Sequence, residues 1–536
     1  MVKKAWYAEL LPGKYDEYKA LHDNIWPDMV KMFEEAGVRN YSIWNIDNML
    51  FGYYECDDPN LLKIVEEKYE CMSEWREITA KLVRFRTQEE GGSNLTKVFD
   101  LPKLKDIQGW YFMKIMVVGG GGREHAIIKK LKENKTVEKI YALPGNGGMT
   151  KDAECVEIGA KEIDKIVEFA VENKIDYAVV APDDPLVLGC VDALEEKGIA
   201  CFGPRKNAAI IEGSKVFSKN LMKKYGIPTA QYEVFCDMDK ALEYLKTAPI
   251  PTVIKADGLA LGKGVIIAMT REEAVNAVKS MMEDKIFGDS GNNVVIEEFL
   301  TGPEVSVLSF TDGKTVIPMV SSMDHKRARD NDEGLNTGGM GTIAPNPVYT
   351  KKIADECMEK IFIPTIEAMN KEGRTFKGCL YFGLMLTEKG PKVIEYNCRF
   401  GDPETQVVLP LLESDLLTVM QAVTNETLSD TEVKFSGGAA CCVVMASDGY
   451  PQKYDTGFEI SIPDEYFDNV FVAGAKIADG KTVTAGGRVL GVTALGECLE
   501  KAISNAYEIV PHINFENAYY RKDIGAKALS LSKKEN

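Results

Sequence analysis

The first hundred residues show a mixed strand and helix pattern. Residues 3–11 alternate between apolar and polar side chains, which is typical of a half-buried strand, and 41–44, 50–55 and 96–101 are also expected to be strands. Residues 15–36 carry an apolar stripe at helical spacing, and 61–82 hold one or two helices. The order β-α-β-β-α-β predicts a ferredoxin-like domain over residues 1–104, with a linker at 105–112.

A different pattern begins at residue 113. The apolar run MKIMVV at 113–118 is typical of a strand buried in a parallel sheet, and strands and helices then alternate to about residue 203. This predicts a doubly wound α/β domain over 113–214. Another apolar strand, at 439–445, begins the last region. We therefore expect a multidomain chain of α/β and α+β classes, divided at 1–104, 113–214, 215–436 and 437–536.

A glycine-rich loop, DGLALGKG at 257–264, follows the apolar strand PTVIK at 251–255. Glycine lets backbone N–H groups approach an anion closely, so Gly258, Gly262 and Gly264 together with Lys255 and Lys263 suit a polyphosphate. The spacing differs from a Walker A loop, since glycine stands where Ser or Thr would hold magnesium. A nucleotide-binding loop of another kind is predicted, with a hairpin turn as the alternative.

The earlier glycine cluster, GGGGREH at 119–125, also lies between a strand and a helix. It lacks the last glycine of a dinucleotide fingerprint, because Glu124 occupies that position, and the next strand does not end in an acidic residue. A helix N-terminus with free N–H groups still suits a phosphate. A phosphorylated small substrate is therefore favoured over NAD.

Composition narrows the class of protein. The net charge of −18 argues against a nonspecific nucleic-acid binder, and no apolar stretch reaches the length of a membrane span. The N-terminus shows no signal-peptide pattern. The twelve cysteines are scattered without a CxxC motif, and only four histidines are present, so a zinc site is not expected. Reduced thiols favour a cytoplasmic protein.

Two polar positions near the end of an apolar strand suggest a metal site. Glu395 and Asn397 lie two residues apart, so both point to one face of the strand, and two oxygen ligands on one face suit Mg²⁺. A solvated polar face is the alternative. The charged run DHKR at 324–327 and the glycine-rich NTGGMG at 336–341 are candidates for substrate contact, with an exposed turn and a plain loop as alternatives.

From residue 113 to about 529 the chain resembles the phosphoribosylamine–glycine ligase family of ATP-grasp enzymes. The resemblance is carried, in family order, by the segments GGGGREH (119–125), PGNGG (144–148), FGP (202–204), EGSK (212–215), IKADG (254–258), EEFL (297–300), DHKR (324–327), NTGGMG (336–341), EYNCRFGDPETQ (395–406), GGRVL (486–490) and YRKDIG (520–525). One departure is Asp183 in PDDP at 182–185, where the family usually has glutamate. The resemblance implies a pre-ATP-grasp domain, an ATP-grasp domain and a small C-terminal domain.

The family reaction joins glycine to 5-phosphoribosylamine with ATP and Mg²⁺ or Mn²⁺. The resemblance implies that Lys215 and Lys255 hold the ATP phosphates, and that the loop from Asp257 to Gly264 closes over them. It places Glu297 and Glu298 near adenine and Glu304 near the ribose. The remaining implied contacts are the metal ligands Glu395 and Asn397, and the substrate residues Gly121, Gly122, Arg123, Asn146, Asp324, His325, Lys326, Arg327, Gly338, Gly339 and Arg399.

Residues 1–104 resemble the L-rhamnose mutarotase family, small dimeric ferredoxin-like proteins. The matching residues are EY (17–18), LH (21–22), NIWP (24–27), NYSI (40–43), Trp75 and VFDLP (98–102). The resemblance implies His22 as acid/base for sugar ring opening, with Tyr18, Tyr41 and Trp75 against L-rhamnose or another aldose. Glu74 stands where the family often has tryptophan. An inactive module that makes the chain a homodimer is the alternative.

Overall fold

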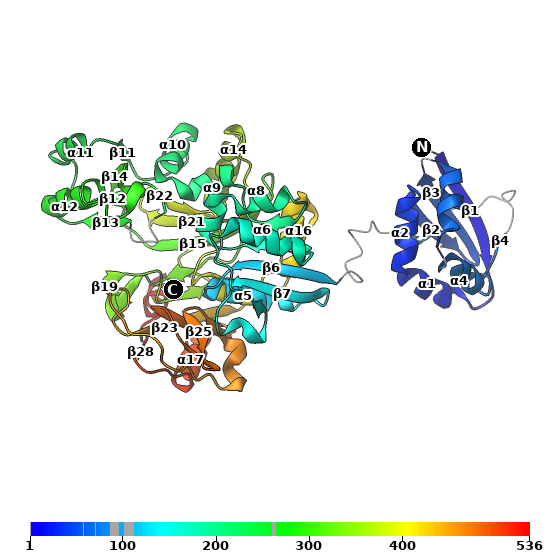
Figure 1. Cartoon of the computed structure of the whole chain (residues 1–536). Coiled ribbons are helices and arrows are strands. Elements are labelled where there is room, and N and C mark those ends of the chain that lie inside the picture. The colour runs from blue at the N-terminus through cyan, green and yellow to red at the C-terminus, as the bar shows by residue number, and fades with distance from the viewer. Residues whose placement is uncertain are drawn as a thin grey trace. The chain divides into compact units, whose positions relative to one another are not determined.

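The computed structural model describes residues 2–56, 58–69, 71–85, 96–100, 112–259 and 264–535. Two compact units divide the chain, Met1–Phe112 and Met113–Asn536 (Figure 1). Each unit has its own buried core. The linker predicted at 105–112 falls almost entirely outside the described residues.

The first unit is a sheet covered by helices. Its strands are β1 (Val2–Leu10), β2 (Arg39–Ile46), β3 (Met49–Cys56), β4 (Val83–Phe85) and β5 (Thr96–Asp100), in the order β4-β1-β3-β2-β5. Its helices are α1 (Tyr15–Asp23), α2 (Pro27–Glu35), α3 (Pro59–Glu66) and α4 (Cys71–Thr79). Met29 and Val30 of α2 pack with Ile43 and Leu50 of the sheet in one core. The ferredoxin-like class is therefore confirmed.

Two details of the predicted pattern are wrong. The helix expected over 15–36 is two helices, because Pro27 begins α2 after an extended Trp26, and proline has no N–H for a continuous helix. The fourth ferredoxin-like strand is β4, which pairs with β1 through Leu10 and Val83. The strand predicted near 96–101 exists as β5, but it adds to the opposite edge beside β2.

The second unit begins with a parallel sheet. Its strands are β6 (Met113–Gly119), β7 (Val137–Pro144), β8 (Glu154–Cys155), β9 (Tyr177–Val180) and β10 (Ala200–Phe202), in the order β10-β9-β6-β7-β8. Alternate residues of β6 enter two cores: Ile115 packs with one and Met116 with the other. Apolar side chains therefore cover both faces, as in the predicted doubly wound layer. Its helices are α5 (Gly122–Lys132), α6 (Ile163–Glu172), α7 (Asp183–Leu188), α8 (Cys190–Glu195) and α9 (Lys206–Gly213).

Two antiparallel sheets follow. Helix α10 (Lys215–Tyr225) leads to the first, ordered β11-β14-β12-β13, with strands β11 (Tyr232–Phe235), β12 (Thr252–Ala256), β13 (Val265–Ala268) and β14 (Val294–Glu298). It has its own core with α11 (Met238–Leu245) and α12 (Arg271–Met282), and projects from one side of the unit (Figure 1). The second sheet, ordered β16-β15-β21-β22, contains β15 (Glu304–Thr311), β16 (Val316–Pro318), β21 (Gly378–Thr387) and β22 (Gly390–Asn397).

The last sheet combines strands from either side of the predicted boundary at 436/437. It is ordered β17-β20-β23-β27-β24, with β17 (Met323–Asp324), β20 (Gly341–Ala344), β23 (Ala439–Ser447), β24 (Val470–Val472), β27 (Arg488–Gly496) and β28 (Ala518–Tyr519). Helices α17 (Leu499–Ile509) and α18 (Ala526–Glu535) follow late in the chain. Remaining elements include α13 (Lys351–Cys357), α14 (Ile363–Lys371), α15 (Thr405–Val408), α16 (Leu416–Asn425), β18 (Arg327–Arg329), β19 (Glu333–Asn336), β25 (Ala475–Ala478) and β26 (Lys481–Thr484).

None of the helices within the described ranges is long and apolar enough to cross a membrane.

Candidate functional site

A cavity of about 690 Å³ in the second unit is lined by residues from three of its sheets. Strands β12 and β14 contribute Lys255 and Glu297, and β22 contributes Glu395 and Asn397. The segment that begins at β17 contributes charged side chains from Asp324 onward. Most of the predicted ligase residues therefore meet in one space, although they lie up to 184 positions apart, from Lys215 to Arg399. The other predicted residues that line it are Lys215, Gly258, Gly264, Glu298, Glu304, His325, Lys326, Arg327, Gly338 and Arg399.

Lys255 belongs to a buried ion-pair network under the cavity. Its Nζ donates to the carbonyl of Ile394 at 3.0 Å and pairs with the Glu297 carboxylate. Glu297 also pairs with Lys219, whose Nζ donates to Thr229 Oγ1 at 2.8 Å. Burial lowers the pKa of Lys219 to about 8, while the two lysines outweigh burial and lower the pKa of Glu297. The Glu297 side chain therefore fixes two lysines, which leaves only its backbone for the predicted adenine contact.

Lys219 was missed in the sequence. It lies four residues after Lys215 on α10, so the two lysines share a face of that helix, and this spacing was an available signal. Lys215 Nζ donates to the carbonyl of Gly258 at 2.7 Å. That contact joins α10 to the start of the glycine-rich loop, directly beside the cavity.

Asp257 anchors the same loop. Its Oδ1 accepts from the Ser214 hydroxyl at 2.9 Å and from the Val216 N–H at 3.1 Å, at the N-terminus of α10. Asp257 is not among the cavity-lining residues and holds the loop through these bonds, while its nucleotide contact stays a prediction. Gly258 has φ +120°, which favours glycine. Gly262 and Lys263 lie outside the described residues.

The predicted metal ligands lie side by side on the cavity wall. Glu395 and Asn397 occupy alternate positions of β22, and within the described chain the Glu395 carboxylate makes no hydrogen bond or ion pair that would occupy it. Burial opposes ionisation of Glu395, but Lys326, Lys255 and Lys215 lower its pKa, so it is anionic. A carboxylate and an amide oxygen fit a hard divalent cation completed by phosphate oxygens. The described part of the chain holds no group of three or more acidic, histidine or cysteine ligands.

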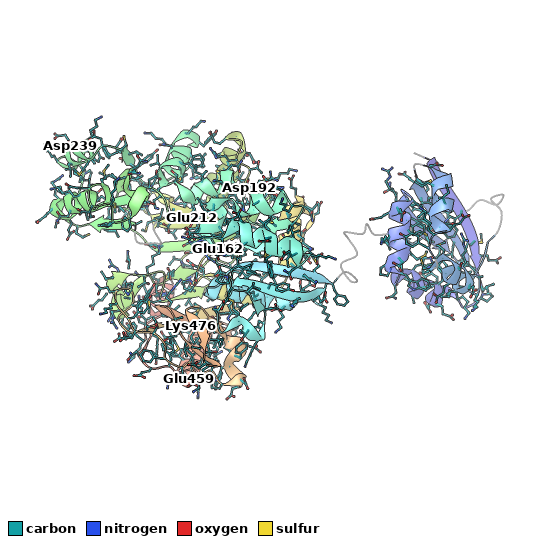
Figure 2. The ribbon with its side chains drawn as sticks, viewed as in Figure 1. Glu162, Asp192, Glu212, Asp239, Glu459 and Lys476 are labelled. Carbon is teal, nitrogen blue, oxygen red and sulfur yellow. The ribbon has the colours of Figure 1, made fainter. Side chains whose placement is uncertain are left out.

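Arg399 lies on another part of the cavity wall. Its Nη2 is 3.2 Å from Glu212 Oε1, and its Nε is buried without a hydrogen-bond partner in the described ranges. Glu212, labelled in Figure 2, also accepts from the N–H of Cys398 at 2.7 Å. Burial works against ionisation of Asp183, but Arg399 and Arg123 lower its pKa. The shorter acid in the PDDP segment is thus still placed near two arginines.

The predicted phosphate-binding residues are next to this wall. Arg123 Nη1 donates to the Phe400 carbonyl at 3.2 Å, and a Cβ on Gly121 would come within 3.4 Å of Asp402 Oδ2. Asn146 donates to the carbonyls of Gly120 and Val472 at 3.0 and 2.8 Å. Its amide holds two backbone segments together, and its substrate contact stays a prediction. Gly121, Gly122, Arg123 and Asn146 are not among the cavity-lining residues.

The three side chains of the segment from His325 to Arg327 have different partners. His325 is buried and accepts from the Gly525 N–H at 3.1 Å, so it supports the C-terminal segment. Burial lowers its pKa to about 4. Arg327 Nη1 donates to the Gly334 carbonyl at 2.8 Å across the β18–β19 hairpin. Lys326 Nζ lies 3.0 Å from Glu304 Oε2 and has a raised pKa because of that carboxylate.

Aromatic rings surround His22 in the first unit. Tyr18 and Trp75 lie with their ring centroids 4.1 and 5.1 Å from it, and Trp26 packs against Trp75 at 5.4 Å. His22 Nδ1 is 2.9 Å from the Tyr18 carbonyl, which can only accept, so Nδ1 carries the hydrogen and Nε2 the lone pair. Burial lowers the pKa of His22 to about 4.

Tyr41 lies between Phe33 and Tyr54, with centroids 5.3 and 5.4 Å away. Tyr18 and Trp75 belong to one buried core, and Tyr41 packs against that core. The four aromatic and imidazole residues predicted for a sugar site are thus brought into one cluster.

The antiparallel layer of β11–β14 lies beside a polar cavity lined by Lys215 and Lys255, and a family model for an ATP-grasp domain matches residues 213–405, so the second unit contains an ATP-grasp domain. A biotin carboxylase domain of 2-oxoglutarate carboxylase from Hydrogenobacter thermophilus shares this fold, with a TM-score of 0.61 and 17% identity, over 76% of this chain and 92% of that one.

Family models narrow the class. Those described as phosphoribosylglycinamide synthetase N domain, ATP-grasp (A) domain and C domain match residues 113–212, 213–405 and 440–527. The phosphoribosylamine–glycine ligase of Caldanaerobacter subterraneus is 50% identical over 415 residues, 77% of this chain and 100% of the relative. The crystal structure of the same-named protein from Thermotoga maritima has a TM-score of 0.69 and 35% identity, over 77% of this chain and 100% of that one. The chain belongs to the phosphoribosylamine–glycine ligase family.

The first unit has a separate relationship. The family model described as L-rhamnose mutarotase matches residues 3–101. Both resemblances found in the sequence are therefore confirmed. The roles of the individual site residues stay predictions, as do the domain boundaries.

Proposed function

We propose that this chain joins glycine to 5-phosphoribosylamine, forming glycinamide ribonucleotide, ADP and phosphate in purine synthesis. The observation that carries the proposal is the meeting of Lys215, Lys255 and Glu395 in one cavity of a chain from this family. The glycine carboxylate takes the terminal phosphoryl group of ATP and becomes an acyl phosphate. The amine then attacks the acyl carbon, phosphate leaves, and a proton is lost from nitrogen.

The lysines serve the first of these steps. Phosphoryl transfer depends mainly on positioning and on neutralising charge on the phosphoryl oxygens. Lys215 and Lys255 present two ammonium groups at fixed positions, because Gly258 and Glu297 hold them. Gly258 and Gly264, in the described parts of the glycine-rich loop, line the same cavity, and Glu304 would contact the ribose hydroxyls.

Glu395 and Asn397 would hold Mg²⁺, which Mn²⁺ can replace. When bound, this ion neutralises phosphate charge and orients the phosphoryl group. Arg399 and Asp183 form the wall that would receive the phosphorylated amine, and Arg123 lies next to this wall. Gly122 and the N-terminus of α5 would add N–H groups suited to its phosphate, beside Gly121, whose own N–H donates to Glu124 Oε2 at 2.6 Å.

An ADP-release assay tests the proposal. Release should require glycine and phosphoribosylamine together. Equal release with D-alanine or bicarbonate in place of glycine would contradict it.

A second function is favoured for the first unit by the cluster around His22. We propose that it is an L-rhamnose or related aldose mutarotase, in which neutral His22 moves a proton through Nε2. Tyr18, Tyr41 and Trp75 would pack against the sugar. Homodimerisation through this unit is part of the proposal, and Trp44 and Phe51 on the sheet, 6.5 Å apart and only partly buried, suit such a contact. An inactive dimerisation module remains the alternative.

The expected partners are small molecules, because the net charge of −18 disfavours nucleic acid. All twelve cysteines are unpaired in the structure, which suits a reducing compartment. We therefore place the protein in the cytoplasm.

A further inference from the structure

The outer edge of β24 is held by side chains of the first α/β layer. β24 is the last strand in the order of its sheet, so one side of its backbone faces away from β27 and its polar groups must be satisfied in another way. Val472 donates its N–H to His125 Nδ1 at 2.8 Å, and its carbonyl accepts from Asn146 Nδ2 at 2.8 Å. The carbonyl of Val470, two residues earlier, accepts from Lys129 Nζ at 3.0 Å. Polar side chains thus take the place of a partner strand.

His125 fits both of its partners in one protonation state. Its Nδ1 accepts from Val472, so Nε2 carries the hydrogen and donates it to Asp152 Oδ2 at 3.1 Å. The side chain is fully buried, and burial lowers its pKa. The neutral imidazole is therefore an acceptor toward β24 and a donor toward its own layer.

The PGNGG segment at 144–148 brings the same strand close. A Cβ on Gly148 would lie 2.3 Å from Val472 Cβ, and a Cβ on Gly147 would lie 2.6 Å from the carbonyl carbon of Lys476. Any larger residue at the two glycine positions would force these contacts apart. The motif found in the sequence therefore belongs to a junction between the first layer and the chain around the end of β24.

β24 is linked to the cavity wall through Arg488, the first residue of β27. In the pairing of the two strands, Val472 lies opposite the residue two positions after Arg488. Arg488 donates to the carbonyls of Gly338 and Gly339 at 2.6 and 3.4 Å, and it pairs with the Asp402 carboxylate at 3.2 Å. Gly338 and Asp402 line the cavity. A shift of β24 would therefore move the side chain that holds two parts of the wall.

Asp402 connects this wall to the beginning of α5. A Cβ on Gly121 would lie 3.4 Å from Asp402 Oδ2. Burial opposes ionisation of Asp402, but Arg488 and Arg123 lower its pKa. His125 lies in the first turn of the same helix. The contacts thus form a closed path from α5 through β24 and β27 to the wall beside the N-terminus of α5.

We propose that His125 is a positioning residue of the ligase, which holds Arg488 and the wall at Asp402 in place for the phosphorylated amine. The inference rests on the proposed ligase function, in which this wall and the N-terminus of α5 receive phosphoribosylamine. His125 is not among the cavity-lining residues, so it acts through β24. The lysines proposed to bind ATP, Lys215 and Lys255, belong to α10 and β12. Loosening the junction should therefore weaken binding of the amine and leave binding of ATP unchanged.

Two substitutions distinguish the two nitrogen atoms of His125. The Oδ1 of His125→Asn can replace Nδ1 as the acceptor, whereas His125→Gln places its amide near Nε2 and offers no acceptor to Val472. Steady-state ADP release by the full chain, with each substrate varied in turn, measures the effect. His125→Gln should raise the KM for phosphoribosylamine about 10-fold, with a smaller change in kcat, because a buried N–H loses its acceptor. His125→Asn should restore most of the loss, and the KM for ATP should stay near wild type in both.

Lys129→Met tests the same strand at a partly exposed position. It removes the donor to the Val470 carbonyl but keeps the aliphatic stem, so the KM for phosphoribosylamine should rise about threefold. Lys130→Met is the matched control. Lys130 is the next residue of α5 and pairs with Glu133 of its own first layer at 2.7 Å, so this variant should keep the wild-type KM.

A KM for phosphoribosylamine within twofold of wild type in His125→Gln would overturn the proposal. So would equal increases in the Asn and Gln variants, or an equal increase in the KM for ATP, since either result would indicate a general loss of structure. If His125→Gln does not fold, Lys129→Met decides: a KM for phosphoribosylamine equal to that of Lys130→Met refutes the proposal. Absence of ADP release by the wild type with glycine and phosphoribosylamine would instead refute the ligase function.

Discussion

Lys255 and Glu297 form an ion pair across neighbouring strands, and both side chains are only 4% exposed. Glu297 is shared with Lys219, so one buried carboxylate holds two ammonium groups at the wall of the cavity. Such a network costs desolvation energy, and its value here is the fixed position that it gives to a phosphate-binding lysine.

Removing the shared carboxylate should therefore destabilise the protein. We expect Glu297→Gln to lower the free energy of unfolding by about 3–5 kcal/mol, because two buried ammonium groups lose their anion. Denaturant unfolding followed by far-UV circular dichroism measures this. Glu298→Gln is the control, since Glu298 is 44% exposed and pairs with Lys392 at the surface, and it should cost at most about 1 kcal/mol. Equal effects of the two variants would show that the buried ion pairs of Glu297 do not stabilise the protein more than a surface ion pair does.

The metal ligand can be tested without a structural change. Glu395→Gln keeps the shape of the side chain but removes its charge, so turnover should fall by about 10²–10³ or more, and stabilisation by Mg²⁺ with ATP should weaken. Steady-state kinetics and ligand-dependent thermal shifts measure the two effects. Glu388→Gln, in the exposed turn before β22, should behave like wild type. If turnover of Glu395→Gln at limiting Mg²⁺ is unchanged, Glu395 is not a metal ligand.

Acid should lower the free energy of unfolding of the first unit, because His22 takes up a proton more readily in the unfolded state. The pKa of His22 is about 4 in the folded protein against 6.5 ordinarily, so the unfolded state binds more protons between these values. Stability is then full above pH 6.5 and falls as pH drops toward 4, by up to about 3 kcal/mol. All five tryptophans lie in the first 112 residues, so tryptophan fluorescence reports unfolding of this unit in the full chain. His22→Gln should flatten the pH dependence, and a slope equal to wild type would contradict this prediction.

The proton-transfer role of His22 is a separate test. If the first unit is a mutarotase, the wild type should speed exchange between L-rhamnose anomers, seen by saturation transfer in NMR, and His22→Ala should abolish it. His512→Ala, in the second unit, should leave exchange intact. Sedimentation should show the same dimer for all three proteins. Absence of exchange in the wild type with every aldose tried would favour the dimerisation module.

Sequence reasoning succeeded where local pattern and chemistry coincide. Lys255 lies at the end of a buried strand, directly before a glycine-rich loop. Glu395 and Asn397 lie at alternate positions of another strand. These local patterns made it possible to expect a common cavity. The anchoring role of Asp257 could not be predicted, because its partner Ser214 is 43 positions away and no local pattern shows a carboxylate bonded to a helix N-terminus. Strand β4 was missed because three residues are too few for a recognisable alternation. Glu404 and Asp324 are brought to the same cavity only by folding, so no local pattern could relate them.

The pairing of β20 with β23 has a consequence for recombining parts of such proteins. Gly341–Ala344 lies within the span predicted for the ATP-grasp domain, yet it hydrogen-bonds to residues 440–443 of the last sheet. A chimera joined near residue 437 would place a foreign strand against β20, and a truncation there would leave a bare strand edge able to pair with other chains. The portion of chain exchanged between relatives without loss must therefore be the whole of 113–536, with the first unit as the part that can be added or removed.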